Sequence, residues 1–181
     1  MELNQSTDAQ AVVIRPYGQA DAADTLAIFL AAVTETAAAD YSPEQIQAWA
    51  QPEARDLPTW HASIQERNSY VATVDGAPAG FSDVNSVGYI DMLFVAPRYQ
   101  RRGVARQLIA RVEAHARTAQ LTELTSDVSI TARPFFERHG FTVEAEQHPV
   151  SGGVTLTNYK MKKRLRDSAV RLSGQLVCLN S

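Results

Sequence analysis

Residues 90 to 108 read IDMLFVAPRYQRRGVARQL, and this stretch decides the fold. The apolar run from Met92 to Ala96 predicts a buried strand, and Pro97 marks its end because proline cannot donate a hydrogen bond to a strand ladder. After Gly103 the apolar residues recur at the spacing of an amphipathic helix. These helical positions are Val104, Leu108 and Val112. The stretch therefore predicts a strand, a tight turn and a helix.

Arginines crowd the start of this predicted helix, at Arg98, Arg101, Arg102 and Arg106. The helix macrodipole and the free N–H groups favour anions at a helix N-terminus, so each cation there costs about 0.3–1 kcal/mol unless an anion is bound. Backbone N–H groups from Arg101 to Ala105, with Gly103 allowing close approach, would bind phosphate groups. The turn is therefore predicted to be a diphosphate site.

Composition narrows the class of protein. The chain has 181 residues, 45% of them hydrophobic and 20% charged, which predicts one ordered globular domain. The net charge of −3 argues against broad binding to nucleic acid or to an anionic membrane. A single cysteine, Cys178, and no Cys/His cluster at metal spacing favour a metal-free protein in the reducing cytoplasm. Met1 to Gln10 lack the pattern of a secretory signal, and the apolar run Leu26 to Val33 is expected to be too short to span a bilayer.

The N-terminal part is predicted to contain one strand and three helices. The strand covers Val12 to Arg15, and the helices cover Ala20 to Ala39, the segment from an N-cap at Ser42 to Trp49, and Thr59 to Glu66. Ser42 and Gln45 fit a capping box. Tyr41 and Trp49 are candidates for an acceptor pocket, although packing in the core explains them equally well. His61 is a weaker candidate for a substrate-side base, because a lone helical histidine is more often a surface or capping residue.

The rest of the chain alternates strands and helices. Tyr70 to Val74 and Ala79 to Val84 are predicted to pair as antiparallel strands around an Asp75-Gly76 turn. The strand Tyr89 to Ala96 follows, and a helix ending near Ala119 should place the next strand parallel to it. The remaining predicted elements are the strand Leu121 to Val128, the helix Ala132 to His139 ended by Gly140, and the strands Phe141 to Glu146 and Val154 to Met161. Lys162 to Ser181 show no clear period, and residues 166–181 form a tail of uncertain role.

Two motifs give these elements a family resemblance. Residues 100 to 105, QRRGVA, match Gln/Arg-x-x-Gly-x-Gly/Ala and, between a strand and a helix, resemble motif A of the GCN5-related N-acetyltransferases, the GNAT family. Ser129 to Phe141 resemble motif B, commonly Asn-x-x-Ala-x-x-Phe/Leu-Tyr-x-x-x-Gly-Phe. The resemblance covers Val71 to Lys163. Within the family, the sequence is similar to a subgroup of small bacterial acetyltransferases.

The resemblance implies one GNAT domain over residues 1–165 with an α/β (α+β) fold. Its centre would be a mixed, mostly antiparallel sheet of six to seven strands, with helices on both faces and a splay between the fourth strand, Tyr89 to Ala96, and the fifth, Leu121 to Val128. The implied activity is acetyl-CoA-dependent transfer of an acetyl group to a primary amine of a small molecule or peptide, by direct attack in a ternary complex. The resemblance implies neither a nucleic acid nor a membrane partner, and it leaves a homodimer open.

The same resemblance implies a cofactor site. The fourth strand would hold the pantetheine of acetyl-CoA, the arginine-rich loop its diphosphate, and motif B the region around the sulfur. The implied residues are Leu93, Phe94, Val95, Gln100, Arg101, Arg102, Gly103, Val104, Ala105, Arg106, Ser129, Arg133 and Phe136. Ser129 replaces the usual Asn and can still donate a hydrogen bond. Phe136 replaces the Tyr that protonates the leaving thiolate in many members, and a phenyl ring cannot give a proton.

Proton transfer is therefore the open question. A free alkyl amine has a pKa near ~10, so a base or a water chain must deprotonate the acceptor. Asp91 is the first candidate base, because burial of a carboxylate in an apolar strand is costly without a role. A structural aspartate bonded to a neighbouring loop explains it equally well, and Asp83 is the next option and a candidate for the substrate pocket. Ser129 acting through water, or Tyr159, could supply the acid, although a thiol pKa near ~8.5 makes a dedicated acid dispensable.

Two other classes of protein are considered. Phe136 is compatible with a non-catalytic acyl-CoA-binding regulatory module that has kept the cofactor loop and lost proton transfer. A generic nucleotide-binding α/β protein is disfavoured, because no Gly-x-Gly-x-x-Gly or Walker pattern follows any predicted strand.

Overall fold

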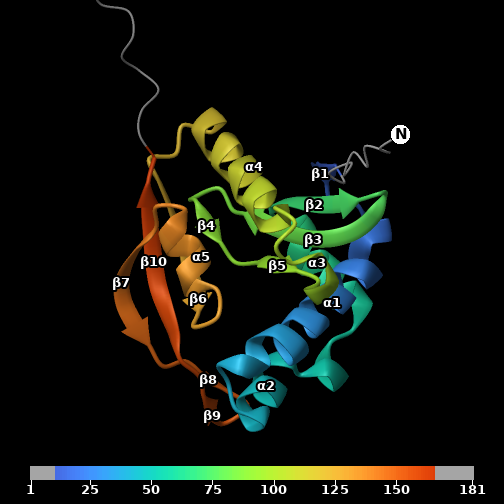
Figure 1. The fold of residues 1–181 in the computed structure, drawn as a ribbon, viewed down its shortest axis with the longest axis vertical. Coiled ribbons are helices and arrows are strands. Elements are labelled where there is room, and N and C mark those ends of the chain that lie inside the picture. The colour runs from blue at the N-terminus through green and yellow to red at the C-terminus, as the bar shows by residue number, and fades with distance from the viewer. Residues whose placement is uncertain (1–10, 166–181) are drawn as a thin grey trace, which may run out of the picture.

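Two half-sheets form the centre of the computed structural model, which describes residues 11–165 (Figure 1). The first is antiparallel and contains β1 (Val12–Pro16), β2 (Asn68–Val74), β3 (Ala77–Val84) and β5 (Leu93–Val95) in the order β1-β2-β3-β5. The second contains β4 (Tyr89–Ile90), β6 (Glu123–Ser129), β10 (Asn158–Arg164) and β7 (Thr142–Gln147) in the order β4-β6-β10-β7. As predicted, the strand before the long helix runs parallel to the strand after it, because β4 pairs with β6 in parallel.

The connection between β2 and β3 follows directly from the sequence. Asp75 and Gly76 both have positive φ, 51° and 79°, as the favoured two-residue hairpin turn requires. Val74 pairs with Ala77 across the turn, which fixes the register of the hairpin. The predicted hairpin is confirmed.

The predicted strand Tyr89 to Ala96 is broken at Asp91 and Met92, and this break creates the splay. The Asp83 carboxylate accepts hydrogen bonds from the N–H groups of Asp91 (2.9 Å) and Met92 (3.1 Å). The Met92 carbonyl accepts bonds from the Asp83 N–H (3.1 Å) and the Ser82 hydroxyl (2.8 Å). Because these bonds satisfy the backbone at the break, the chain can leave β6 after Ile90 and continue along β3. The predicted splay is confirmed, and the prediction of one continuous strand is corrected.

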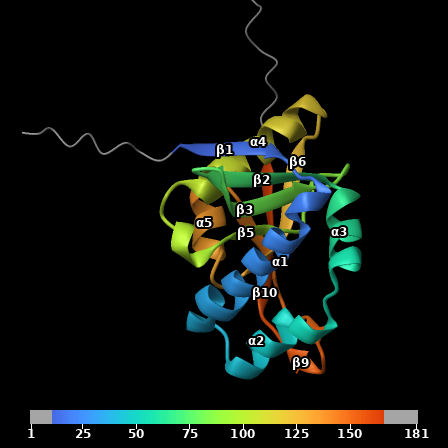
Figure 2. The same cartoon turned by 90° about the vertical axis from the view of Figure 1, so that its right-hand side faces the viewer.

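Helices cover both faces of the first half-sheet, as predicted (Figure 2). α4 (Val104–Thr118) lies on one face and buries an apolar stripe that includes Leu108 and Val112. α1 (Ala22–Ala31) and α3 (Leu57–Gln65) lie on the other face, where Phe29 and Ile64 join a second apolar cluster. β5 passes between these two clusters.

The predicted helix from Ala20 to Ala39 changes type along its length. A 3-10 turn, η1 (Gln19–Asp21), leads into α1, which is followed by a π-helical segment, η2 (Ala32–Thr36), and a second 3-10 turn, η3 (Ala37–Ala39). By length and composition alone the helix Gln19–Ala39, which contains the apolar run Leu26 to Val33, could cross a membrane. In this fold Ile28, Phe29 and Val33 are instead buried against the protein interior.

α2 (Pro43–Ala50) begins at the predicted capping box. The Ser42 hydroxyl accepts the Gln45 N–H (3.2 Å), and the Gln45 side chain accepts the Ser42 N–H (3.0 Å). The Gln45 amide also donates to the Thr155 carbonyl (2.9 Å), which ties α2 to the C-terminal part of the chain. Two short 3-10 turns, η4 (Pro52–Ala54) and η5 (Pro97–Tyr99), complete the connections before α4.

The C-terminal strands differ from the prediction. The predicted strand Val154 to Met161 is divided in two: β9 (Val154–Thr155) forms a small hairpin with β8 (Val150–Ser151), and β10 starts at Asn158. Gly152 and Gly153, both with positive φ, make the hairpin turn. α5 (Arg133–Arg138) precedes β7 and packs beside β6 (Figure 1). β10 includes Lys162 to Arg164, the first residues of the segment predicted to have no clear period, and residues 166–181, the predicted tail, lie outside the described residues.

Candidate functional site

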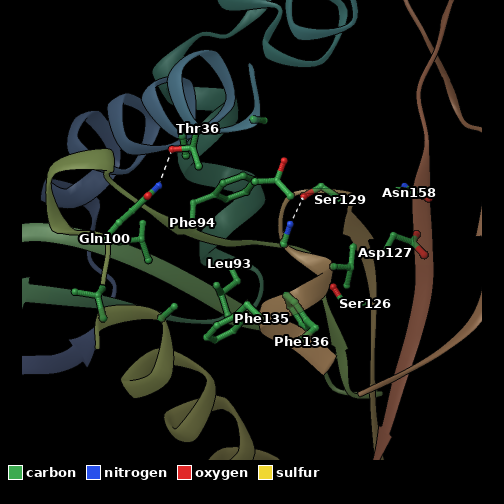
Figure 3. Close-up of a pocket in the computed structure, with 18 of the residues that line it drawn as sticks. Thr36, Leu93, Phe94, Gln100, Ser126, Asp127, Ser129, Phe135, Phe136 and Asn158 are labelled. Atoms are coloured by element: carbon green, nitrogen blue, oxygen red, sulfur yellow. Dashed lines mark hydrogen bonds between the residues drawn. The ribbon is translucent and has the colours of Figure 1, made fainter. Parts of the chain in front are cut away.

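A cavity of about 670 Å³ lies at the splay between β5 and β6 (Figure 3). The start of α4 and the loop before it line one end, and β5, β6 and α5 line the middle. η2, α2, the segment after β9 and the start of β10 complete the wall. Segments far apart in the sequence therefore meet around one cavity.

The start of α4, where the first backbone amides have no intrahelical acceptor, lines this cavity. Gly103 is the N-cap residue with φ +81°, and no side chain caps the helix. The bond from the Gln107 N–H to the Gly103 carbonyl (3.0 Å) closes the first helical turn, so the amides of Val104 to Arg106 have no intrahelical acceptor. Arg101 and Arg106 line the same end of the cavity. Backbone donors and guanidinium groups together fit a diphosphate.

Gln100 links the loop before α4 to the helical wall opposite. Its side-chain amide donates to the Thr36 hydroxyl (2.6 Å), and Figure 3 shows the two side chains facing each other at one end of the cavity. Thr36 ends the π-helical segment η2, and such segments occur frequently at functional sites. Sequence reasoning missed Thr36, because no motif marks it.

The amide groups of β5 have a defined direction. The Ala96 N–H bonds to the Ala79 carbonyl (2.9 Å), and the Asp83 N–H bonds to the Met92 carbonyl (3.1 Å). Since hydrogen-bonded pairs alternate along an antiparallel ladder, Phe94 is the next residue of β5 to bond to β3. The N–H groups of Leu93 and Val95 then point away from β3, toward the splay.

Motif B lines the middle of the cavity. The Ser129 hydroxyl oxygen accepts the Ala132 N–H (3.1 Å), which leaves its proton available for donation. Phe136 is buried and makes edge contacts with Phe135 and Phe141, with ring centroids 5.7 and 5.0 Å away. This end of α5 therefore offers an apolar wall and no phenol.

Tyr41 and Trp49 line the cavity; Tyr41 is also buried in an apolar cluster, against which Trp49 packs. Their ring centroids lie 5.4 Å apart. The Tyr41 hydroxyl accepts the Ile130 N–H (2.9 Å) and donates to the Thr157 carbonyl (2.5 Å). Tyr41 thus joins the loop after β6 to the segment before β10.

Asp91 lines the cavity, but it is not buried as expected. Its side chain is 36% exposed and forms an ion pair with Arg67, because the break in the strand brings it to the surface. Arg67 also bonds to Asp83 (3.0 Å), which is 1% exposed and does not line the cavity. Burial raises the pKa of the Asp83 carboxyl, although Arg67 and the amides of Asp91 and Met92 favour the ionised form. Asp83 therefore stabilises the splay and is not brought to the substrate pocket.

Three other predicted site residues also lie away from the cavity. Tyr159 occupies the opposite face of β10 from Asn158 and packs against the Arg133 guanidinium, 4.4 Å from its ring centroid. Arg133 forms an ion pair with Glu137 (2.8 Å), and Arg102 lies beside the ring of Tyr99. The cavity lining includes none of the three residues Tyr159, Arg133 and Arg102.

His61, the weaker candidate base, is also remote from this cavity. Its ring nitrogen Nδ1 lies 3.1 Å from the Tyr17 hydroxyl. Both residues line a separate groove of about 200 Å³. The structure therefore does not bring His61 to the other candidate residues.

Two polar residues that sequence reasoning missed do line the cavity, Asp127 and Asn158 (Figure 3). Asp127 accepts a bond from the Tyr89 hydroxyl (3.2 Å). Asn158 Oδ1 is fully buried and has no hydrogen-bond partner among residues 11–165. The available signal was alternation: Leu124, Ser126 and Val128 are buried on one face of β6, so Asp127 faces the other side.

Comparison with known proteins identifies the family. Residues 37–163 match the family model described as acetyltransferase (GNAT) domain. The chain is 42% identical over 151 residues to the uncharacterized N-acetyltransferase YafP of Escherichia coli, and the match covers 83% of this chain and 95% of that protein.

Solved structures agree with this match. A GCN5-related N-acetyltransferase from Rhodopseudomonas palustris is 36% identical with a TM-score of 0.82, over 86% of this chain and 98% of that one. YncA from Salmonella typhimurium, crystallised with its cofactor acetyl-CoA, shares the fold with a TM-score of 0.64 at 22% identity, over 88% and 97% of the two chains. The predicted family, fold class and enzyme class are confirmed: this chain belongs to the GNAT acetyltransferase family.

Proposed function

We propose that this enzyme transfers an acetyl group from acetyl-CoA directly to a primary amine of a small molecule or peptide, with both substrates bound at once. One observation supports this proposal above the others. A single cavity has the uncapped, arginine-lined start of α4 at one end and carboxylates with aromatic side chains farther along its wall. No covalent acyl-enzyme is needed when donor and acceptor share one cavity.

The residues that would hold acetyl-CoA fall into two groups. The amides at the start of α4, with Arg101 and Arg106, would bind the diphosphate. The edge of β5, Ser129 and the apolar wall at Phe136 would hold the pantetheine. The bound cofactor supplies an acetyl thioester whose thiol, with a pKa near ~8.5, is a mild leaving group.

The amides of Leu93 and Val95 are the candidate donors to the carbonyl oxygen that gains negative charge during transfer. These amides point toward the splay because the alternate residues in and beside β5, Met92, Phe94 and Ala96, are the ones that form hydrogen-bonded pairs with β3. One such fixed donor contributes about 2.7–4 kcal/mol to transition-state stabilisation. This contribution does not depend on a proton donor at position 136.

Asp91 is the candidate that accepts the proton of the acceptor ammonium, directly or through water. It lines the cavity, and Arg67 holds its Oδ2, which leaves Oδ1 for the acceptor or a water molecule. The Ser129 hydroxyl, through water, is the candidate donor to the leaving thiolate. Tyr159 is not supported in this role, because it lies on the far face of β10.

The test uses the purified chain in two steps. Calorimetry with coenzyme A should show binding, and acetyl-CoA with a broad panel of primary amines should release thiol faster than acetyl-CoA alone. Binding without transfer to any amine would favour the acyl-CoA-binding module, and absence of binding would remove the diphosphate assignment.

The role of Asp91 has a separate test. Asp91→Asn should lower kcat most at low pH, where loss of the acceptor's proton limits the rate. Asp24→Asn, which removes an exposed carboxylate of α1, is the matched control. A pH–rate profile that Asp91→Asn leaves unaltered would exclude Asp91 as the base.

A further inference from the structure

Charged side chains divide the cavity into two regions. Among the described lining residues the basic ones are Arg101 and Arg106, near the start of α4, and Arg138, on α5. The acidic ones are Asp91 and Asp127, which directly follow the paired residues Ile90 of β4 and Ser126 of β6. Negative charge is therefore gathered at the β4–β6 edge, away from the cofactor loop.

The two carboxylates differ in how far the protein neutralises them. Asp91 is paired with Arg67. Asp127 accepts a bond from the Tyr89 hydroxyl, a neutral group, and is exposed. Lys160 of β10 is directly opposite Asp127 of β6, but its ammonium nitrogen lies 4.0 Å from Glu144, which also pairs with Lys162. Within residues 11–165 Asp127 forms no ion pair, so its carboxylate is available to a cation in the cavity.

A second observation on the same face also calls for a hydrogen-bond donor. Asn158 is the cross-strand neighbour of Ser129, and both lie on the face of the second half-sheet that carries Asp127. Asn158 Oδ1 is a buried carbonyl oxygen without a donor, which is an unfavourable state. Asn158 lines the cavity, and rotation about its last side-chain torsion, which is soft in asparagine, exchanges the places of the amide oxygen and nitrogen.

Aromatic rings complete this wall. Trp49 and Tyr41 line the same cavity, and aromatic faces attract organic cations. A carboxylate without a counter-ion, an unpaired amide oxygen and aromatic rings together match the chemistry of an alkylammonium group. They do not match a carboxylate or a phosphate.

We propose that Asp127 is a specificity-determining residue, which pairs with a second, cationic amino group of the acceptor while the first amino group is acetylated. The preferred acceptors are therefore diammonium compounds. Asn158 Oδ1 receives an N–H of the same acceptor. This inference rests on the proposed function, because it assigns an acceptor class to the same cavity.

The experiment uses three acceptors with one four-carbon chain: 1,4-diaminobutane, 1-aminobutane and 4-aminobutanoate. Apart from the reacting amine, 1,4-diaminobutane carries a second cationic group, 1-aminobutane carries no charge, and 4-aminobutanoate carries an anionic carboxylate. For the unaltered enzyme kcat/KM should fall in that order, with the first about five- to tenfold above the second. Asp127→Asn, which can still accept the Tyr89 bond, should raise KM for the diamine and bring the first two acceptors within about twofold. The control Asp24→Asn should keep the original order.

The outcomes separate this inference from the proposed function. Coenzyme A binding is measured first, and its absence removes the proposed function itself. With coenzyme A bound, equal kcat/KM for diamine and monoamine, or a preference that Asp127→Asn leaves unchanged, overturns the role of Asp127. Should none of the three acceptors react, calorimetry of 1,4-diaminobutane with the coenzyme A complex decides. Binding that Asp127→Asn weakens supports the inference, and no binding overturns it.

Discussion

Replacement of Gly103 by alanine tests the start of α4 without adding a steric clash. Apart from the chain neighbours of Gly103, the atom nearest to an added Cβ would be Arg106 Nη2, at 3.9 Å. The cost comes instead from φ, +81°, which is a left-handed conformation. For a residue with a Cβ this conformation costs about 1–2 kcal/mol.

The expected effect on cofactor binding follows from this cost. If the loop relaxes in the free enzyme, the left-handed conformation must be restored when coenzyme A binds. A cost of about 1–2 kcal/mol then weakens binding by a factor of about 5–30. Calorimetry with coenzyme A measures this change directly.

Gly76→Ala is the matched control. Gly76 has nearly the same φ, +79°, and an added Cβ would meet nothing within 4 Å. It lies in the β2–β3 turn and does not line the cavity. Gly76→Ala should reduce the free energy of unfolding by a similar amount and leave the Kd for coenzyme A unchanged. The reasoning is refuted if Gly103→Ala binds coenzyme A as tightly as Gly76→Ala does.

Other perturbations test the surrounding structure. Gly80→Ala would place a Cβ 2.7 Å from the Phe94 carbonyl, so it should displace β5, cost about 1–3 kcal/mol in urea unfolding and lower kcat; unchanged stability would contradict the close packing of β3 and β5. Tyr41→Phe should cost about 1–3 kcal/mol, since it removes the partner of two backbone groups, and should raise the acceptor KM more than the cofactor KM. Asp21→Asn should cost about 1.5–3 kcal/mol at pH 7. Its hydrogen bonds with Arg15 lower the pKa of Asp21, so this contribution is present above an unfolded-state pKa near ~3.9 and is lost as the pH falls through the lower folded-state pKa. The urea midpoints of the unaltered protein and of Asp21→Asn should therefore differ at pH 7 and converge at low pH. An equal difference at both pH values would contradict the role of the Arg15–Asp21 ion pair.

Local sequence patterns predicted much of the fold because the interactions involved are local. The Asp75-Gly76 turn, the capping box at Ser42 and the apolar stripe of α4 all depend on residues a few positions apart. The tight turn before α4 was predictable for the same reason, since Gly103 and the arginines around it are close together in sequence. Most of the predicted cofactor residues line the cavity, as do Asp91, Tyr41 and Trp49.

The missed features depend on contacts between distant segments. The break at Asp91 depends on Asp83, a buried carboxylate of the neighbouring strand. Asn158 and Tyr159 are adjacent, and a shift of one residue in strand register exchanges the faces they occupy. The sequence favoured Tyr159 for its hydroxyl, whereas the register directs it to α5. Asp127 was missed because its orientation depends on which face of β6 packs on the helices.

The hydroxyl of Tyr41 has a consequence for attempts to exchange acceptor preference between members of this family. It links the N-terminal helices to the Ile130 amide and to the carbonyl of Thr157, which is 116 residues away from Tyr41 in the sequence. A chimera that imports only the N-terminal helices of a relative without this hydroxyl would leave both backbone groups without their partner. Transplantation of selectivity should therefore require the helical segment and the region around β8 to β10 to be exchanged as a matched set.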